Sequence, residues 1–309
     1  MAIIRPFICI RPNEKVAHKV AALPYDVYDR QEAKLEIERE PLSFLRVDRA
    51  ETNFDDSVDA YDPAVYRKAN EILQQMIDDG TFITDNKECY YVYELVMGER
   101  SQTGLVACAS IDDYLSNVIK KHENTREDKE IDRIRHVDVC NANTGPIFLA
   151  YRANKIINDA VAEAMKAAPI YSFTSHDGIR HNVWRIDHDE LILKIKNAFE
   201  DIDSIYIADG HHRAASAVKV GLMRRKSNPG YTGREEFNYF LAVLFPHDQL
   251  MIMPYNRVVK DLNGLTEDEF LAEVSRKFEL TLIGSEPFAP EKKAVFGMYL
   301  DGKWYRLVT

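Results

Sequence analysis

The sequence predicts a mixed α+β fold, with mixed β-sheets flanked by helices. Stretches of strand and helix character follow one another in irregular order, without the regular alternation of a parallel α/β fold. The composition is globular, because 46% of the 309 residues are hydrophobic and 29% are charged. A chain of this length buries about three quarters of its unfolded surface, so its core needs no disulfide or metal ion.

Residues 1–309 are expected to form one large unit, with two lobes of about 1–112 and 113–309 as the alternative. The chain stops at Leu307-Val308-Thr309, in the middle of an expected strand, which favours a native chain that continues further. No basic leader with a long apolar run begins the sequence, and no apolar run reaches about 18 residues. These features predict a cytoplasmic protein without a membrane-spanning helix.

The charge balance and the cysteines exclude some classes of function. With 40 Lys and Arg against 50 Asp and Glu, the net charge is −10. This acid excess argues against a general nucleic-acid binder, which needs clustered basic residues. The four cysteines form no C-x-x-C pair, so neither a zinc knuckle nor a thioredoxin-like site is indicated, and no metal site is assigned. The sequence leaves a homo-oligomer open.

The first third of the chain shows clear boundaries of helices and strands. Residues 3–10 are interpreted as a strand that Pro6 places at an edge or a bulge. Asp29 begins a helix that ends before Pro41, and residues 43–47 are interpreted as a short strand. Asp62-Pro63 begins a second helix, whose apolar residues recur every three or four positions until Gly80.

The rest of the chain predicts a hairpin and then mixed elements. Residues 89–97 and 104–111 form the expected hairpin. The strands expected after it are 147–151, 170–174, 180–187, 204–208, 237–245, 250–253 and several in the last 30 residues. The helices expected after it are 154–167, 188–200, 211–225 and one from Thr266 to about Phe278, which a capping box begins.

The run Asp209-Gly210-His211-His212-Arg213 is the sharpest local pattern. A buried strand leads into it and a helix rich in small residues follows, so free backbone N–H groups of the first helical turn face outward. Arg213 adds a fork that suits phosphate or carboxylate, and the two histidines titrate near neutrality. Adjacent helical residues diverge by about 100°, so His211 and His212 should have different roles. The alternative is a capped helix with surface histidines and a solvated arginine.

A second charged segment surrounds His122-Glu123. Thr125 and Asp128 are spaced as a capping box, which predicts a helix from about Arg126. Arg126, Lys129, Arg133 and His136 then share one helical face, as a basic stripe for a polyanionic ligand. Glu123 beside it is a candidate general base or metal ligand. The alternative is a solvated helix stabilised by ion pairs between neighbouring turns.

Several motifs in order carry a resemblance to a known family. They are Ile4-Arg5-Pro6-Phe7, Arg11-Pro12, Pro24-Tyr25-Asp26-Val27, Pro41-Leu42-Ser43-Phe44-Leu45, His122-Glu123-Asn124-Thr125 and Asp209-Gly210-His211-His212-Arg213. With them the chain resembles the bacterial and archaeal family known as domain of unknown function 1015, from the first residues to at least position 260. The family carries no settled activity.

The run at 209–213 is also similar to the phosphate-site turn of the ParB/sulfiredoxin-like superfamily, including its free-serine kinases. The resemblance implies that Asp209, Gly210, His211, His212 and Arg213 hold nucleotide phosphates or the phosphate being transferred, and that a glutamate acts as the base, for which Glu123 is the candidate. Asp209, His211 and His212 are the other candidate catalytic residues. Arg126 and His122 are further candidates for binding the nucleotide, which is expected to be ATP or ADP with Mg²⁺.

Three functions follow from these residues. The first is a small-molecule phosphotransferase whose acceptor is a hydroxyl compound, free serine among them. The second is a non-enzymatic module that senses a nucleotide or another anion, as ParB-like domains do. The third is a metal-dependent hydrolase that uses Asp209, His122 and one histidine of 211–212, but it lacks the H-x-x-x-H spacing of metal ligands.

Overall fold

The computed structural model describes residues 1–125, 127–253 and 255–309, with the side chains of 128 and 129 outside that description. The chain divides into two compact units, Met1–Leu250 and Met251–Thr309. The expected lobe boundary near residue 112 falls inside the first unit, where the strands on its two sides pair with each other.

The helices and strands follow the mixed order that the sequence predicts. The α-helices are α1 (Ala17–Val20), α2 (Arg30–Arg39), α3 (Leu45–Asp48), α4 (Pro63–Asp78), α5 (Ile111–Leu115), α6 (Glu127–Cys140), α7 (Lys155–Ala164), α8 (Asp189–Glu200), α9 (His211–Ser227) and α10 (Glu267–Ser275). The short 3-10 helices are η1 (Tyr25–Val27), η2 (Ala50–Asn53), η3 (Glu236–Asn238) and η4 (His247–Gln249). The strands are β1 (Ile4–Arg5), β2 (Ile10–Pro12), β3 (Phe82–Thr84), β4 (Tyr90–Met97), β5 (Arg100–Ser110), β6 (Ile119–Lys120), β7 (Ile147–Tyr151), β8 (Tyr171–Thr174), β9 (Arg180–Ile186), β10 (Ile205–Asp209), β11 (Tyr239–Pro246), β12 (Glu279–Gly284), β13 (Val295–Leu300) and β14 (Lys303–Val308).

The first unit is built on one large mixed sheet. Its strand order is β6-β10-β7-β11-β5-β4-β9-β8, and β1 pairs with the end of β5. The pairs β6–β10 and β7–β11 are parallel, whereas the others along the path are antiparallel. The mixed α+β class expected from the sequence is therefore the fold of this unit.

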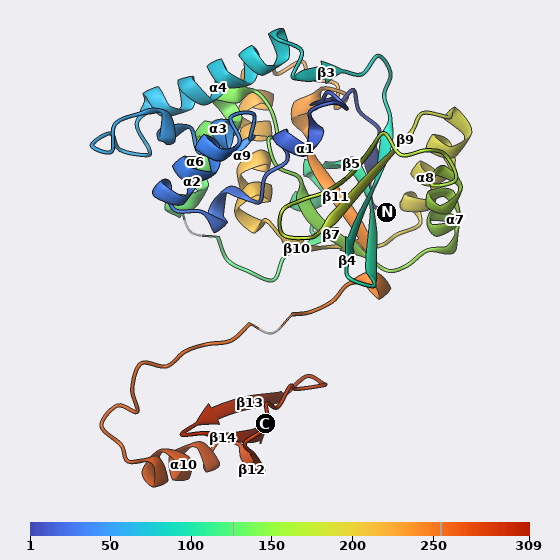
Figure 1. Ribbon diagram of the computed structural model, residues 1–309. Coiled ribbons are helices and arrows are strands. Elements are labelled where there is room, and N and C mark those ends of the chain that lie inside the picture. The colour runs from blue at the N-terminus through green and yellow to red at the C-terminus, as the bar shows by residue number, and fades with distance from the viewer. Residues whose placement is uncertain (126, 254) are drawn as a thin grey trace. The chain divides into compact units, whose positions relative to one another are not determined.

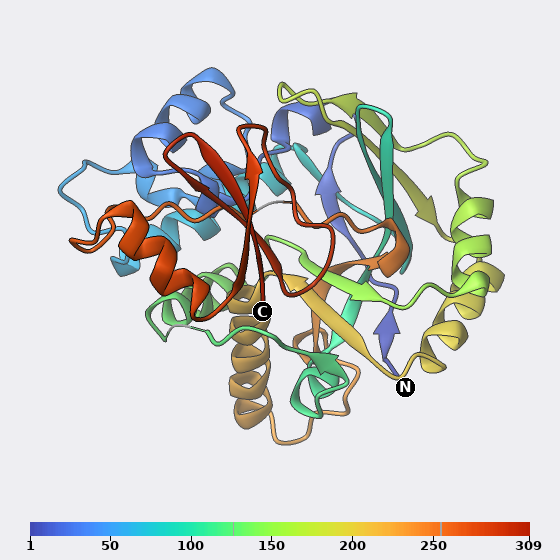
Figure 2. The same cartoon turned by 90° about the horizontal axis from the view of Figure 1, so that it is seen from below.

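Helices flank the large sheet on two sides. In Figures 1 and 2, α7 and α8 lie on one side of it, and α4, α6 and α9 lie on the other. The main core joins alternate residues of the central strands, such as Leu105, Phe240 and Leu149, with Ile157 of α7 and Phe199 of α8. The small residues Ala214 and Ala217 of α9 are buried in the same core, as their size predicts.

A second core lies between the helices on the other side. The buried face of α4 contains Val65, Ala69, Ile72 and Met76, which is the apolar spacing seen in the sequence. Asp62 caps this helix through Ala64 N–H, as expected. Cys140 of α6 belongs to the same core, and α6 packs against both α4 and α9.

Two expected strands are wrong. In place of the strand expected over 43–47, the chain forms the short helix α3 over Leu45–Asp48, and Val47 packs with residues of α4 in the second core. Residues 250–253 form no strand either, since η4 ends β11 at Pro246 and the chain leaves the sheet. The strand expected over 3–10 is interrupted after Arg5, where Pro6 cannot donate a backbone hydrogen bond.

The second unit holds a small antiparallel sheet in the order β12-β14-β13. Thr266 begins α10 with the capping box that the sequence predicts, through Glu269. Across both units, none of the helices within the described residues has the length and apolar character that crossing a bilayer requires.

Candidate functional site

Three chain segments converge at one edge of the large sheet because of its strand directions. β6 and β10 are parallel, with Ile205 opposite Ile119, so both chains leave the sheet at the same edge. Residues 121–123 therefore come to lie beside the turn at 209–213. β7 is antiparallel to β10, and Asp209 is opposite Phe148, so the segment 145–146 that enters β7 lies at this edge as well.

Gly210 forms the junction between β10 and α9. Its backbone has φ 90° and ψ 34°, the left-handed region that side chains with a Cβ rarely adopt. It stands at the N-cap position of α9, and no side chain caps the helix there. The amide groups at the start of α9 therefore retain donor capacity and a partial positive charge at this edge of the sheet.

Arg213 folds back over that junction. Its Nη2 is 2.7 Å from Oδ2 of Asp209, and its Nη1 donates to the carbonyl oxygen of Pro146 at 2.6 Å. The guanidinium packs on Gly210, since a Cβ at that position would lie 3.1 Å from Nη2. The Asp209 side chain is 69% exposed and that of Arg213 is 20% exposed. The carboxylate of Asp209 thus occupies the position at Arg213 that an anionic ligand would take.

His211 points into the fold, toward the segment after β6. Only 4% of its side chain is exposed, and its Nδ1 lies 3.4 Å from Oε2 of Glu123. Its Nε2 accepts a long hydrogen bond of 3.5 Å from the backbone N–H of His122, whose ring packs edge-on at a centroid distance of 4.4 Å. We therefore assign the neutral His211 ring a proton on Nδ1, facing the carboxylate of Glu123.

The surroundings of His211 favour its neutral form. Burial lowers the pKa of His211, and the neighbouring His122 lowers it further. Glu123 and Asp209 act in the opposite direction without reversing the shift. The neutral ring of His211 is therefore favoured, with Nδ1 facing the carboxylate of Glu123 at 3.4 Å.

His212 points elsewhere, as expected for an adjacent residue on a helix. Its Nδ1 is shielded from solvent and has no hydrogen-bond partner among the residues that the structure describes. His212 lies near Glu130 of α6, where it contributes to the lowered pKa of that carboxyl group. The two histidines of the run therefore have different neighbours, His122 and Glu123 for one and Glu130 for the other.

The expected basic stripe of α6 is a buried contact face in its described part. The guanidinium of Arg133 lies 4.1 Å from the ring centroid of Tyr25 and pairs with Asp132. His136 is buried and its Nε2 lies 3.2 Å from the carbonyl oxygen of Val47. Both side chains are occupied by packing partners, so they do not form a solvent-facing anion surface. Arg126 and the side chain of Lys129 lie outside the described residues.

Tyr25 connects this helix face with the candidate site. Burial raises the pKa of Tyr25, while the positive charges of Arg133 and Arg213 oppose that rise. In the sequence, the polar turn that ends in Gly145-Pro146 is a weak candidate for ligand contact, and the structure places Pro146 against Arg213. The sequence does not single out Glu130 and Lys219 as neighbours of the site, because only the packing of α6 on α9 brings them there and no local pattern marks them.

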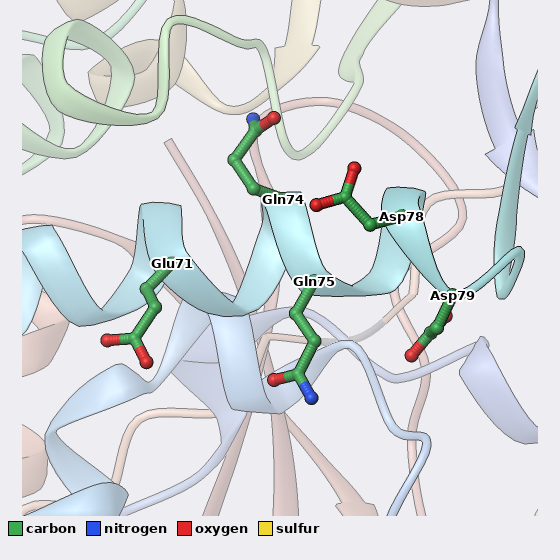
Figure 3. A pocket seen from close by; sticks show the side chains of 5 residues that line it. All are labelled: Glu71, Gln74, Gln75, Asp78 and Asp79. Carbon is green, nitrogen blue, oxygen red and sulfur yellow. The ribbon is translucent and has the colours of Figure 1, made fainter.

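Other hollows and clusters do not extend the site. Figure 3 shows a hollow on the outer side of α4, lined by exposed Glu71, Gln74, Gln75, Asp78 and Asp79. It contains no residue of the segments that converge at 209–213. Within the described part of the chain, no group of three or more His, Cys, Asp or Glu side chains is arranged to hold a metal ion.

The structure brings together most of the residues that the sequence singled out. Asp209, Gly210, His211 and Arg213 meet His122 and Glu123 at one edge of the sheet, whereas Arg126 is outside the described residues. A search of curated proteins gave no match, and a search of solved structures gave none. A family described as "Protein of unknown function (DUF1015)" matches residues 4–309, and the chain belongs to that family.

Proposed function

We propose that the chain binds a nucleotide at the 209–213 turn and transfers a phosphoryl group to a hydroxyl of a small molecule, free serine among the candidates. One observation carries this proposal: a carboxylate, Glu123, lies 3.4 Å from His211 at the uncapped N-terminus of α9. Phosphoryl transfer needs a positioned base beside a group of donors that neutralises phosphate charge. The similarity to ParB/sulfiredoxin-like kinases is part of this proposal.

The phosphate-binding role falls to α9 and Arg213. The amide groups of the first turn of α9 and the guanidinium of Arg213 offer donors that fit phosphate oxygens. For Arg213 to bind phosphate, it has to exchange the carboxylate of Asp209 for a phosphate oxygen. The released Asp209 would then be available to Mg²⁺, which nucleotides carry mainly on their phosphates.

Glu123 is the proposed general base. It would accept the proton of the acceptor hydroxyl while the hydroxyl oxygen bonds to the γ-phosphorus of ATP. The bond from that phosphorus to the bridging oxygen breaks, and ADP leaves with the electron pair. The Nδ1–H of His211 would hold the carboxylate of Glu123 in place during this step.

A non-enzymatic anion sensor is the second candidate, and the closed Asp209–Arg213 pair favours it. An anion that replaces Asp209 at Arg213 would also release the contact of Arg213 with the carbonyl oxygen of Pro146. Binding would then change the junction between β7, β10 and α9 without any chemical step.

The two candidates are separated by binding and turnover measurements on matched variants. Thermal shift with ATP, ADP and other nucleotides is measured first, and a panel of hydroxyl compounds is then tested with γ-labelled ATP. We expect Arg213→Ala to abolish both binding and turnover. Glu123→Gln should keep binding and lower kcat by about 10²- to 10⁴-fold. The control is Arg224→Ala, which removes a half-exposed arginine farther along α9.

Binding without turnover across the whole panel would replace the enzyme by the sensor. No thermal shift with any nucleotide, together with no labelled product, would refute the enzyme and a nucleotide sensor. A sensor of another anion would be refuted if inorganic phosphate and sulfate gave no thermal shift either.

A further inference from the structure

The segment that carries His122 and Glu123 is exposed, yet both of its ends are fixed. At one end, β6 pairs with β10 through Ile119 and Lys120. At the other end, the hydroxyl of Thr125 donates to Oε1 of Glu130, at the start of α6. Glu123 lies between these two anchors and 63% of its side chain is exposed. The hydrogen bond from Thr125 to Glu130 therefore restricts the positions that the carboxylate of Glu123 can take.

Glu130 is an unusual residue for the helix interface in which it lies. Its side chain is only 7% exposed, whereas its partner Lys219 of α9 is 52% exposed. The ammonium of Lys219 bonds to Oε2 of Glu130, and the hydroxyl of Thr125 bonds to the other oxygen. Burial alone would raise the pKa of Glu130, but the hydrogen bonds from Lys219 and Thr125 outweigh it and hold the pKa below its ordinary value.

The same residue is tied to α9 at a second point. The hydroxyl of Ser216 donates to the backbone carbonyl of Glu130 at 3.2 Å. Ser216 and Lys219 follow His211 on α9 by about one and a half and two turns. The helix α9 therefore contacts the segment 122–125 in two ways. Its residue His211 faces Glu123 directly. Its residues Ser216 and Lys219 bind Glu130, which in turn accepts the hydrogen bond from Thr125.

We propose that Glu130 is a positioning residue, which with Lys219 and Thr125 forms a clamp that holds Glu123 against His211. The effect of the clamp on catalysis rests on the proposed function. The clamp itself is present in the protein without nucleotide. Lys219 supplies the one charge in this clamp that solvent can reach. Neutralising that charge leaves a buried carboxylate without its cation and weakens the hold on Thr125.

α6 and α9 offer a matched control for this clamp. Arg224 and Asp138 also join the two helices, through an ion pair of 2.7 Å whose side chains are 36% and 39% exposed. This second pair lies toward the far ends of the two helices, away from the converging segments. Asp138→Asn therefore removes a bridge between the same helices without touching Thr125 or Glu130.

The experiment compares Lys219→Met, Lys219→Arg and Asp138→Asn. Because the side chains of Lys219 and Asp138 are partly exposed, their variants should keep the fold, and Lys219→Met should lower the free energy of unfolding because buried Glu130 loses its cation. The backbone N–H of His122 donates to Nε2 of His211, so its hydrogen exchange reports on this contact. That exchange should accelerate at least about tenfold in Lys219→Met, because the variant removes a hydrogen bond between charged groups from the clamp. Lys219→Arg should restore slow exchange, and Asp138→Asn should leave it unchanged.

The ring nitrogens of His211 give a second readout, which general destabilisation would not reproduce. In the wild type, ¹⁵N NMR should show a protonated Nδ1 and an unprotonated Nε2 in the neutral ring. Lys219→Met should shift these signals toward those of Glu123→Gln. The clamp is refuted if exchange of the His122 amide and the His211 signals in Lys219→Met equal those of Asp138→Asn.

Both measurements are made without nucleotide, so they test the clamp whether or not the protein is a phosphotransferase. If the enzyme is active, Lys219→Met should lower kcat at least about tenfold and leave the KM for ATP within about twofold, since Arg213 is untouched. An active enzyme whose kcat does not respond to Lys219→Met would refute the positioning role even if the clamp is present.

Discussion

Gly210 determines the geometry of the candidate site at the scale of a single residue. Its positive φ lets the chain turn from β10 directly into α9, and its missing side chain lets the guanidinium of Arg213 lie on the backbone. Strain and steric contact are therefore both consequences of any larger residue at this position. The two effects can be separated because another glycine of the chain shows only the first.

Gly210→Ala should lower the free energy of unfolding by about 1–2 kcal/mol, because a left-handed backbone conformation is sterically unfavourable for a residue with a Cβ atom. It should also weaken phosphate or ADP binding, because the added Cβ would lie 3.1 Å from Nη2 of Arg213 and push the guanidinium off the backbone. The control is Gly178→Ala, where φ is 82° and no atom lies within 4 Å of the added Cβ. That variant should lose similar stability in urea denaturation and keep its affinity in calorimetry. Equal affinities in both variants would contradict the role given to Gly210.

The titration of His211 tests the geometry around it directly. Glu123 favours the charged ring and His122 disfavours it. Glu123→Gln should therefore lower the pKa of His211 further, and His122→Asn should raise it toward the ordinary value. NMR titration of the ring signals measures both shifts, with His181 as the internal control. A His211 pKa that stays the same in both variants would show that these residues do not face it.

At the scale of elements, the sequence predicts helices with strong caps better than short segments. Asp29, Asp62 and Thr266 cap helices that begin where the sequence placed them. The apolar residues of 43–47 suit a strand or a helix equally, and the packing of Val47 in the core with α4 accompanies the helix over Leu45–Asp48. The face of α6 that looks basic in the sequence is buried by Tyr25 and Val47, which are distant in sequence and invisible to helical periodicity.

The close approach of α9 to its neighbours depends on Gly221. A Cβ at this position would lie 2.4 Å from the carbonyl oxygen of Phe237 and 2.7 Å from Cδ1 of Ile111. Gly221→Ala should therefore cost about 1–3 kcal/mol of stability despite the higher helix propensity of alanine. Urea denaturation measures the loss. The control is Gly230→Ala, where no atom lies within 4 Å; a Gly221→Ala protein as stable as that control would contradict this packing.

At the scale of the molecule, the candidate site is a product of sheet topology. His122 and His211 are 89 positions apart, and the parallel pairing of β6 with β10 brings them together. The sequence predicted each motif and the strand–turn–helix at 209–213, because these depend on local backbone and cap chemistry. It could not predict which strands pair, so the contacts of Arg213 with Pro146 and of Thr125 with Glu130 were beyond it.

The whole molecule should lose stability in mild acid. Burial, as the largest cause, lowers the pKa of His136, His181 and His211 in the folded state. Between their folded pKa values and about 6.5 the unfolded chain binds more protons, so the free energy of unfolding falls as the pH falls below about 6.5. Each histidine contributes a slope of at most about 1.4 kcal/mol per pH unit.

Urea denaturation at a series of pH values from 7.5 to about 5 measures this slope. His136 is only 3% exposed, so His136→Gln should flatten the curve. An equal slope in the wild type and in His136→Gln would show that His136 does not titrate in this way.

The most direct test of nucleotide binding at the 209–213 turn is a crystal structure of the full chain, determined from crystals soaked with Mg²⁺ and ADP. We predict a phosphate group against the backbone N–H groups at the start of α9, with Arg213 turned from Asp209 to a phosphate oxygen. The account is contradicted if the nucleotide occupies another place in the molecule. It is equally contradicted if saturating ADP leaves the Asp209–Arg213 pair closed and no phosphate is bound beside Gly210.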